Sequence, residues 1–364
     1  MEFREYIINE QAYKLVEKGS EYMAVINVTP LTDITALINS DSVAEGDVLL
    51  LEEGIYFQSV AVLKNHIRIV AKGPGVIFDG RSLLMDAFLL PDVIGVMIEG
   101  ITIRHYRASG IAVEFGGSHR IVNNKITNMI ENGIELMSSR GNLIWKNEIE
   151  NCYDGVLLIE GSTNNWVIDN VARGCYGDGY EAFLGPDSDN AFISNLAIGN
   201  RNNGMEIYGS NNLLLDNILI DNGQGVIINE GNSSLAIGNL IRGTKLGTYQ
   251  IFNEYFNHFV GDNNIVCNRR EGIENNGLFN MFVNNEIAFN GDIGILLGQT
   301  SVLNLVMDNK LVCNIPENID ERGIDNHIIN NIEKACEPCQ APSEVCHKIS
   351  KEKSSKEDKD LEDK

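Results

Sequence analysis

The chain has 364 residues and a formal net charge of −23 at pH 7, from 51 acidic and 28 basic side chains. So acidic a surface repels nucleic acid and anionic membranes, and it disfavours polyanionic substrates unless a divalent cation bridges them. No apolar run approaches the roughly 18 residues of a transmembrane helix. The chain does not open on a basic stretch followed by an apolar one, so we expect no signal peptide, and either a cytoplasmic protein or leaderless export, as in spore or phage assembly.

Residues 1–24 predict an N-terminal helical cap. Their apolar residues are spaced as on one side of a helix, and a glycine near the end is a typical stop signal: Phe3, Tyr6, Ile7, Leu15, Val16 and Gly19. A solenoid exposes strand edges at its ends, and a helix across one end is a common cover. We therefore expect this helix to close the first coil of the β-structure that follows.

Residues 25–90 contain short β-type segments separated by glycine-containing turns, with one short helix expected over residues 34–38. The order of this helix, then Gly46-Asp-Val-Leu-Leu-Leu-Glu-Glu-Gly-Ile-Tyr56, then Gly73-Pro-Gly-Val-Ile-Phe-Asp-Gly80 is informative. It resembles the first coils of right-handed parallel β-helix proteins, the pectate-lyase-like superfamily.

From about residue 91 a repeat of 21 to 25 residues becomes explicit. Glycines that open an apolar segment stand at Gly110, Gly133, Gly155, Gly179, Gly204, Gly225, Gly247, Gly272 and Gly294. Asparagines recur at the same interval, at Asn124, Asn147, Asn170, Asn195, Asn217, Asn239, Asn264, Asn285, Asn309 and Asn331. Such a period indicates a solenoid, and the apolar runs are too short for helical repeats. We expect the asparagines to stack in a ladder of side-chain amides.

The repeat is similar to that of the NosD-like right-handed β-helix proteins. The matching pattern is seen in Asn124-Lys-Ile followed by Asn132-Gly-Ile-Glu-Leu136, and it covers roughly residues 45–332. The resemblance implies an all-β fold: one right-handed parallel β-helix of about 10 to 12 coils over residues 25–332. It implies little about function, because the group contains enzymes, binding proteins and scaffolds.

Strand alternation predicts which side chains face outward in each coil. The first and third residues after the glycine are apolar in most coils, so the second must point out. The outward row is expected to run Ala112, Glu135, Leu157, Glu181, Glu206, Ile227, Tyr249, Glu274 and Leu296. Glu181 and Glu206 should be neighbours about 4.8 Å apart, with Phe183 and Tyr208 beside them and Glu135 two coils away.

Paired carboxylates beside aromatic side chains suit glycoside hydrolysis. We therefore take Glu181, Glu206 and Glu135 as candidate catalytic residues, and Phe183, Tyr208, Tyr176 and Tyr249 as candidate sugar-binding residues. The alternatives are a ligand-binding face without chemistry and an ordinary solvated strand face. No metal site is predicted, although such carboxylates could equally bind Ca²⁺.

A second candidate site is the cluster that contains His105 and Arg107. A histidine base and an arginine that binds a substrate carboxylate would suit lyase chemistry, but a solvated turn is the commoner explanation. Asp154 and Asp178 each precede a coil glycine, and the sequence favours a turn-forming role for both.

The cysteines are expected to be reduced in a chain without a leader. Cys152 and Cys175 occupy equivalent places in consecutive coils and predict a stacked pair of buried thiols. Residues 333–364 form a charged, disordered tail in this prediction, with Cys336, Cys339 and Cys346 as a weak Zn²⁺ motif or a site of crosslinking between chains.

Two functions stay open at this stage. The first is a carbohydrate-binding or carbohydrate-active protein, a polysaccharide hydrolase or lyase that uses the outward carboxylates. The second is a non-catalytic scaffold of a bacterial surface, spore or phage assembly. The sequence decides neither whether the protein is an enzyme nor its oligomeric state.

Overall fold

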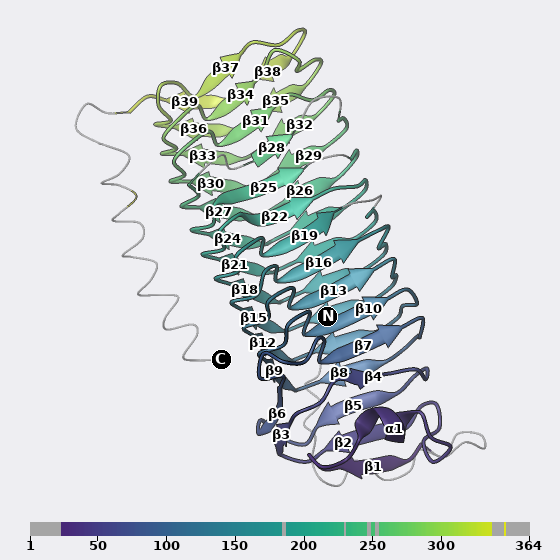
Figure 1. Cartoon of the computed structure of the whole chain (residues 1–364). Helices are drawn as coiled ribbons and strands as arrows, with labels where there is room; N and C mark the ends of the chain where they lie inside the picture. Colours follow the sequence, from purple (N-terminus) through teal and green to yellow (C-terminus); the bar gives the residue numbers. More distant parts are fainter. Residues whose placement is uncertain are drawn as a thin grey trace.

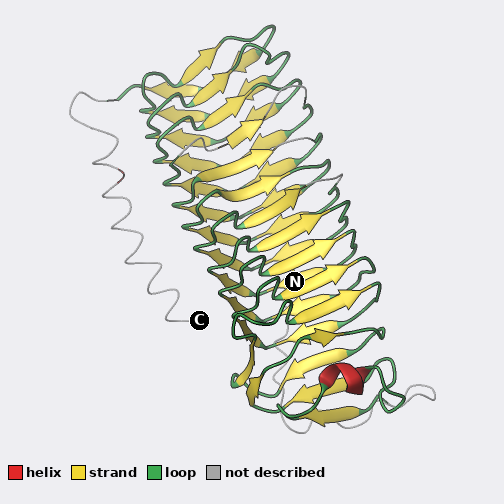
Figure 2. Cartoon of the chain, in the orientation of Figure 1, coloured by secondary structure: helices red, strands yellow, loops and turns green. Residues whose placement is uncertain are grey.

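The computed structural model describes residues 23–183, 187–228, 231–245, 249–251, 255–336 and 346, without the side chains of residues 227, 228 and 249. The described part is a parallel β-helix of about 13 turns (Figures 1 and 2). One short helix, α1 (Ile34–Ile38), lies near its N-terminal end, and the side chain of Asp33 accepts a hydrogen bond from the Ala36 amide to cap it. This helix stands where the sequence predicts it. The described part of the chain has no helix with the length and apolar character to span a bilayer.

Three parallel sheets form the faces of the solenoid, and we name them sheets A, B and C. Sheet A comprises β1 (Val25–Val28), β2 (Val48–Leu51), β5 (Arg68–Ala71), β8 (Met97–Glu99), β11 (Arg120–Val122), β14 (Leu143–Trp145), β17 (Trp166–Ile168), β20 (Ala191–Ile193), β23 (Leu213–Leu215), β26 (Leu235–Ile237), β29 (Phe259–Gly261), β32 (Met281–Val283), β35 (Leu305–Met307) and β38 (His327–Ile329). Sheet B comprises β3 (Gly54–Tyr56), β6 (Val76–Asp79), β9 (Thr102–Arg104), β12 (Lys125–Thr127), β15 (Glu148–Glu150), β18 (Val171–Arg173), β21 (Leu196–Ile198), β24 (Ile218–Ile220), β27 (Leu240–Arg242), β30 (Asn264–Val266), β33 (Glu286–Ala288), β36 (Lys310–Val312) and β39 (Ile332–Lys334). Sheet C comprises β4 (Val60–Ala61), β7 (Phe88–Pro91), β10 (Ile111–Glu114), β13 (Ile134–Met137), β16 (Val156–Ile159), β19 (Tyr180–Phe183), β22 (Asn203–Ile207), β25 (Gln224–Ile228), β28 (Tyr249–Ile251), β31 (Ile273–Asn275), β34 (Ile295–Leu297) and β37 (Ile319–Glu321).

The core is one column of apolar side chains that runs the length of the solenoid. Each coil contributes inward residues from its three strands, and alternation sends the flanking residues outward. The inward positions predicted for sheet C are fully buried, as in the pairs Ile134/Leu136 and Val156/Leu158. Continuous parallel pairing leaves backbone donors and acceptors of each coil bonded to the coils on either side.

Buried asparagine ladders run through the turns. The predicted ladder exists, and within it each side-chain amide bonds the Oδ1 atom of the next asparagine, as between Asn147 and Asn170 at 3.0 Å. Two further ladders were not predicted, and their members include Asn142, Asn165 and Asn190 in one and Asn200, Asn222, Asn268 and Asn290 in the other. The prediction that Asn264 belongs to this ladder is wrong by one residue. Asn239 bonds Asn263 instead, and Asn264 is the first residue of β30.

Two further details correct the sequence-based expectation. The solenoid has about 13 turns rather than 10 to 12, because the first coils lack the Asn and Gly signals that were counted. In sheet C, Tyr249 pairs with the inward positions Val226 and Ile273, and Gln250 takes the outward position between Ile227 and Glu274. The register taken from Gly247 was therefore shifted by one residue.

The expected N-terminal helical cap falls on residues that, apart from 23 and 24, lie outside the described chain; those two lead directly into β1. Most of the tail after Cys336 also lies outside it. Within the described residues, two disulfides join Cys267 to Cys346 and Cys313 to Cys336. These bonds overturn the expectation of reduced thiols at these positions, and they remove Cys336 and Cys346 as Zn²⁺ ligands. Cys152 and Cys175 are free and buried, as predicted.

Candidate functional site

Two glutamates stand on adjacent rungs of sheet C. Glu181 in β19 pairs with Glu206 in β22, and both side chains are half-buried on the outer face. Adjacent parallel strands are about 4.8 Å apart, so the two carboxyl groups are near neighbours. Glu135 lies two rungs from Glu181, because Leu157 pairs with both of them. The expected spacing of the three glutamates is therefore present in the fold.

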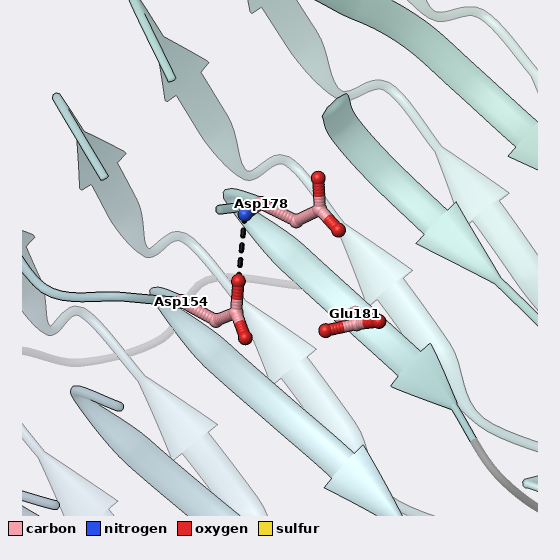
Figure 3. Close-up of side chains that lie close together, drawn as sticks. All are labelled: Asp154, Asp178 and Glu181. Atoms are coloured by element: carbon pink, nitrogen blue, oxygen red, sulfur yellow. Dashed lines mark hydrogen bonds between the residues drawn. The ribbon is translucent and has the colours of Figure 1, made fainter. Parts of the chain in front are cut away.

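Two aspartates complete a buried cluster beside Glu181. Asp154 and Asp178 immediately precede the glycines that lead into β16 and β19, and each is only 3% exposed. One oxygen of each supports the next coil: the Asp178 amide donates to Asp154 Oδ1 at 2.7 Å, and the Asn203 amide donates to Asp178 Oδ1. Carboxylate oxygens of Asp154, Asp178 and Glu181 lie within 4.8 Å of one another (Figure 3). These two hydrogen bonds hold the carboxyl groups of Asp154 and Asp178 in defined positions.

Burial and mutual repulsion change the ionisation of these carboxyl groups. Burial, together with the charges of Asp154 and Asp178, raises the pKa of Glu181 to about 9. Burial and the charges of Glu206 and Asp154 raise the pKa of Asp178 to about 8, although the bond from the Asn203 amide acts in the opposite direction. Burial likewise raises the pKa of Asp154. At neutral pH the cluster therefore retains protons.

Hydrogen bonds orient the other two glutamates. Glu206 accepts from Asn203 Nδ2 at 2.9 Å and from the Tyr208 hydroxyl at 3.3 Å. Glu135 accepts from the Ser109 hydroxyl at 2.8 Å and from Asn132 Nδ2 at 3.1 Å. In both cases an asparagine three residues earlier holds the glutamate.

An aromatic pair lies next to the carboxylates. The rings of Phe183 and Tyr208 are 5.0 Å apart between centroids and meet edge to face at 76°. They occupy the outward positions that follow Glu181 and Glu206. An apolar ring surface beside carboxyl groups is an arrangement that can contact a sugar ring.

The same carboxylates could hold a divalent cation. Asp154, Asp178 and Glu181 offer three oxygen ligands, the hard donors that Ca²⁺ takes. A cation there would require the three groups to be ionised, so it would compete with the protons that the cluster retains. Binding would therefore strengthen as pH rises.

The remaining predicted residues lie away from this cluster. Tyr176 is exposed on the turn before β19, in the same coil as Glu181. Tyr249 has the inward register described above. His105 bonds Asp79 across the turn after β9, where Arg107 is also exposed, and that coil leads into β10, three rungs from β19. That coil adjoins the coil of Glu135, whose carboxyl group accepts from Ser109, but it does not adjoin the coils of Glu181 and Glu206.

Sequence reasoning assigned Asp154 and Asp178 to turns and so missed their place in the cluster. The available signal was that two consecutive coils carry Asp at the same position, three residues before Leu157 and Glu181 respectively. Aspartates that only form turns are usually exposed to solvent, whereas Asp154 and Asp178 are each only 3% exposed.

A cavity lies elsewhere on the solenoid. An open cavity of about 800 Å³ is found on sheet A near the N-terminal end, where Met23, His66, Arg68 and Arg120 help to line it. None of the predicted site residues lines it. We place the candidate site at the carboxylates rather than at this cavity, because converging titratable groups identify chemistry better than volume does.

Comparison with known proteins supports the architecture. A family model described as a right-handed β-helix region matches residues 75–241. A PL6 family polysaccharide lyase from Pseudopedobacter saltans has a TM-score of 0.67 and 14% identity over 86% of this chain and 94% of its own. The catalytic domain of a GH87 α-1,3-glucanase, solved with tetrasaccharides, has a TM-score of 0.63 and 14% identity over 86% of this chain and 67% of its own.

A phage protein has the same architecture. ORF18 of Geobacillus virus E2 has a TM-score of 0.59 and 12% identity over 81% of this chain, which spans 61% of the phage protein's length. No curated protein matches the sequence. At such low identities the structural likeness concerns the fold alone, so function must be argued from the site.

Proposed function

Because the chain is a right-handed parallel β-helix protein, we propose that it acts on carbohydrate through the carboxylates on the outer face of sheet C. The observation that carries the proposal is the buried cluster of Asp154, Asp178 and Glu181 beside Glu206. Structural neighbours that are carbohydrate-active enzymes agree with this function. The reaction we infer is hydrolysis of a glycosidic bond.

The two glutamates have different roles in this reaction. Glu181, with its raised pKa, protonates the oxygen of the leaving sugar as a general acid. Glu206, oriented by Asn203 and Tyr208, is the second carboxylate on the next rung. A separation of one rung, about 4.8 Å, is close to the roughly 5–5.5 Å between carboxyls in retaining enzymes, which assigns Glu206 as the nucleophile.

The substrate class follows from charge. A chain with a net charge of −23 and a cluster of carboxyl groups repels an acidic polysaccharide. A neutral glycan meets no such barrier, and its ring faces can pack on Phe183 and Tyr208. Lyase chemistry at Glu181 is less well supported, because the basic pair His105 and Arg107 lies three rungs from it.

The test is a screen of neutral glucans and fructans for release of reducing ends. We expect Glu181→Gln and Glu206→Gln each to reduce the rate by at least about 10²-fold, the usual loss on removing an acid or nucleophile. The matched control is Glu274→Gln, which changes a glutamate on the same face, bonded to Gln250, outside the cluster. Equal product yields from wild type and all three variants would remove these residues from the site.

A non-catalytic scaffold is the second candidate, and the likeness to a phage protein is the observation that favours it. Its test uses the same samples. Binding of a glycan without product release, weakened by Phe183→Ala, would support a binding protein. Assays with Ca²⁺ and with a chelator show whether the carboxyl cluster works with bound protons or with a bound cation. Only a cation-dependent site loses activity when the chelator is added.

A further inference from the structure

The outer face of sheet A is apolar over eight consecutive strands, β14 to β35. The first and third residues of each strand lie on the outer face, where all but Ala191 and Gly261 are at least partly exposed, while the middle residue is fully buried. We call these sixteen outward residues, two from each of eight strands, the apolar stripe: Leu143, Trp145, Trp166, Ile168, Ala191, Ile193, Leu213, Leu215, Leu235, Ile237, Phe259, Gly261, Met281, Val283, Leu305 and Met307.

The apolar stripe is open to solvent in the described structure. Trp166 is 51% exposed, Leu235 is 42% exposed and Met281 is 39% exposed. Seven intervals of about 4.8 Å make the stripe about 34 Å long. A continuous apolar surface of this length marks an interaction site, because soluble monomers rarely expose large contiguous apolar patches.

A charged row follows one edge of the stripe. The residue after each of the eight strands occupies the same turn position, since its amide bonds the last strand residue of the next coil. These residues are, in order, Lys146, Asp169, Ser194, Asp216, Gly238, Asp262, Asn284 and Asp308. Aspartates therefore occupy every second rung, and the one lysine stands at the end opposite Asp308.

This alternation determines how two copies can meet. A two-fold axis parallel to the strands, between β23 and β26, places β14 against β35 and β17 against β32 of the other copy. The same edges then face each other in reverse order. Every aspartate meets a residue that is not acidic: Asp308 meets Lys146, Asp169 meets Asn284, Asp262 meets Ser194 and Asp216 meets Gly238. Two Lys146–Asp308 ion pairs form by symmetry.

Side-chain sizes agree with the same arrangement. In the first outward row, Ala191 meets Phe259, whose ring also covers Gly261 of its own strand. A small residue thus stands opposite a large one at the Ala191 position, as packed sheets require. Leu213 and Leu235 meet at the axis itself.

We propose that a second copy of this chain packs on the apolar stripe, antiparallel and face to face, to form a two-fold dimer. Eight rungs of about 4.8 Å and five residues of about 3.3 Å give a flat area of roughly 600 Å² per copy, before the relief of the side chains is added. A stable interface needs about 800 Å² per partner. Sheet C lies on a different face of the solenoid, so the dimer leaves the candidate site open.

The experiment is sedimentation equilibrium of the full chain at several salt concentrations. We expect a dimer whose affinity rises with salt, because screening weakens the repulsion between two chains of charge −23. Leu235→Glu puts like charges at the centre and should weaken the dimer by at least about tenfold. Ile218→Glu, a matched change at a 39%-exposed position on sheet B, should leave it unchanged.

A charge exchange tests the antiparallel register. Lys146→Asp and Asp308→Lys should each weaken the dimer by about three- to tenfold, and the double variant should restore it. A dimer that the double variant does not restore would overturn this register. A wild-type chain that stays monomeric would overturn the proposal. Crosslinking of residues 1–22 to the apolar stripe in such a monomer would identify that segment as the occupant instead of a second copy. Loss of activity has no bearing on it, since Leu235 is remote from sheet C.

Discussion

Asp154 and Asp178 serve both the fold and the candidate site. One oxygen of each accepts an amide of the next coil, as the asparagines of the ladders do elsewhere. An asparagine could do the same without a charge, and Asn203 occupies the next place in the row. Burying a carboxyl group instead raises pKa values in the cluster and costs stability. A residue that costs stability where a neutral one would serve is a candidate for function.

The first prediction concerns the pH dependence of the proposed hydrolysis. With a pKa of about 9, Glu181 stays protonated through neutral pH, so activity should fall only as pH rises past about 9. Asp154→Asn removes a charge that repels ionised Glu181, so the alkaline limb should move to lower pH. The measurement is kcat/KM against pH for both proteins. Coincident alkaline limbs would show that Glu181 is not the acid.

The second prediction concerns stability. The pKa of Glu181 is raised on folding, so the folded state binds the extra proton between about pH 4.5 and 9, and stability falls as pH rises through that range. Glu181→Gln cannot ionise. We expect it to match wild type at pH 5 and to exceed it at pH 8 by on the order of 1 kcal/mol in urea unfolding. Glu274→Gln should show no such pH-dependent gain, and a gain of equal size there would refute the interpretation.

At the scale of the element, the asparagine ladders stabilise the turns. Asn195 is fully buried, and its Oδ1 atom accepts from both the amide and the side chain of Asn170. Its Nδ2 atom donates to the Val167 carbonyl and to Asn217. Removing this side chain leaves buried donors and acceptors without partners.

We therefore predict that Asn195→Ala lowers the free energy of unfolding by about 2–4 kcal/mol. Asn202→Ala, at an exposed position in the following turn, should cost less than about 0.5 kcal/mol. Urea titrations followed by circular dichroism measure both. Similar small losses would mean that the ladder bonds exchange with water at no net cost.

The repeat predicted the elements well and the registers less well. Period and alternation place inward residues such as Ile134 and Leu136 correctly, because burial selects side chains at every second position. The register of Tyr249 failed because Gly247 was taken as the start of its strand, and a shift of one residue exchanges the two faces. Asp154 and Asp178 failed for another reason: their burial depends on the stacking of coils, which a single repeat does not contain.

At the scale of the whole molecule, the faces differ in chemistry. Sheet C presents carboxyl and aromatic groups, whereas sheet A presents the apolar stripe. The apolar stripe was not predicted, because an outward row was assigned to only one strand of each coil. The signal is present in the repeated order of apolar, buried and apolar residues before the asparagine, as in Leu213 to Leu215. A solenoid can separate functions in this way because each strand of the coil builds a different face.

The disulfides bind the segment after the last strand to the coils that precede it. Cys267 and Cys313 follow β30 and β36 at one turn position, where both have a positive φ. Asn151, Gly174 and Asp221 have the equivalent place in earlier coils, and these residue types tolerate that conformation better than cysteine.

Reduction of the two disulfides should therefore loosen one end of the solenoid and spare the other. The bonds span 79 and 23 residues, and loops of this size contribute about 3–5 kcal/mol through the unfolded state. Because coils contact only their neighbours, amide exchange should accelerate from β30 onward and remain unchanged in β13 to β19. Exchange measured by mass spectrometry before and after reduction checks this, with a Cys336→Ser/Cys346→Ser variant as a disulfide-free equivalent that needs no reductant. Uniform acceleration along the chain, or alkylation of Cys267 and Cys313 in the unreduced protein, would contradict it.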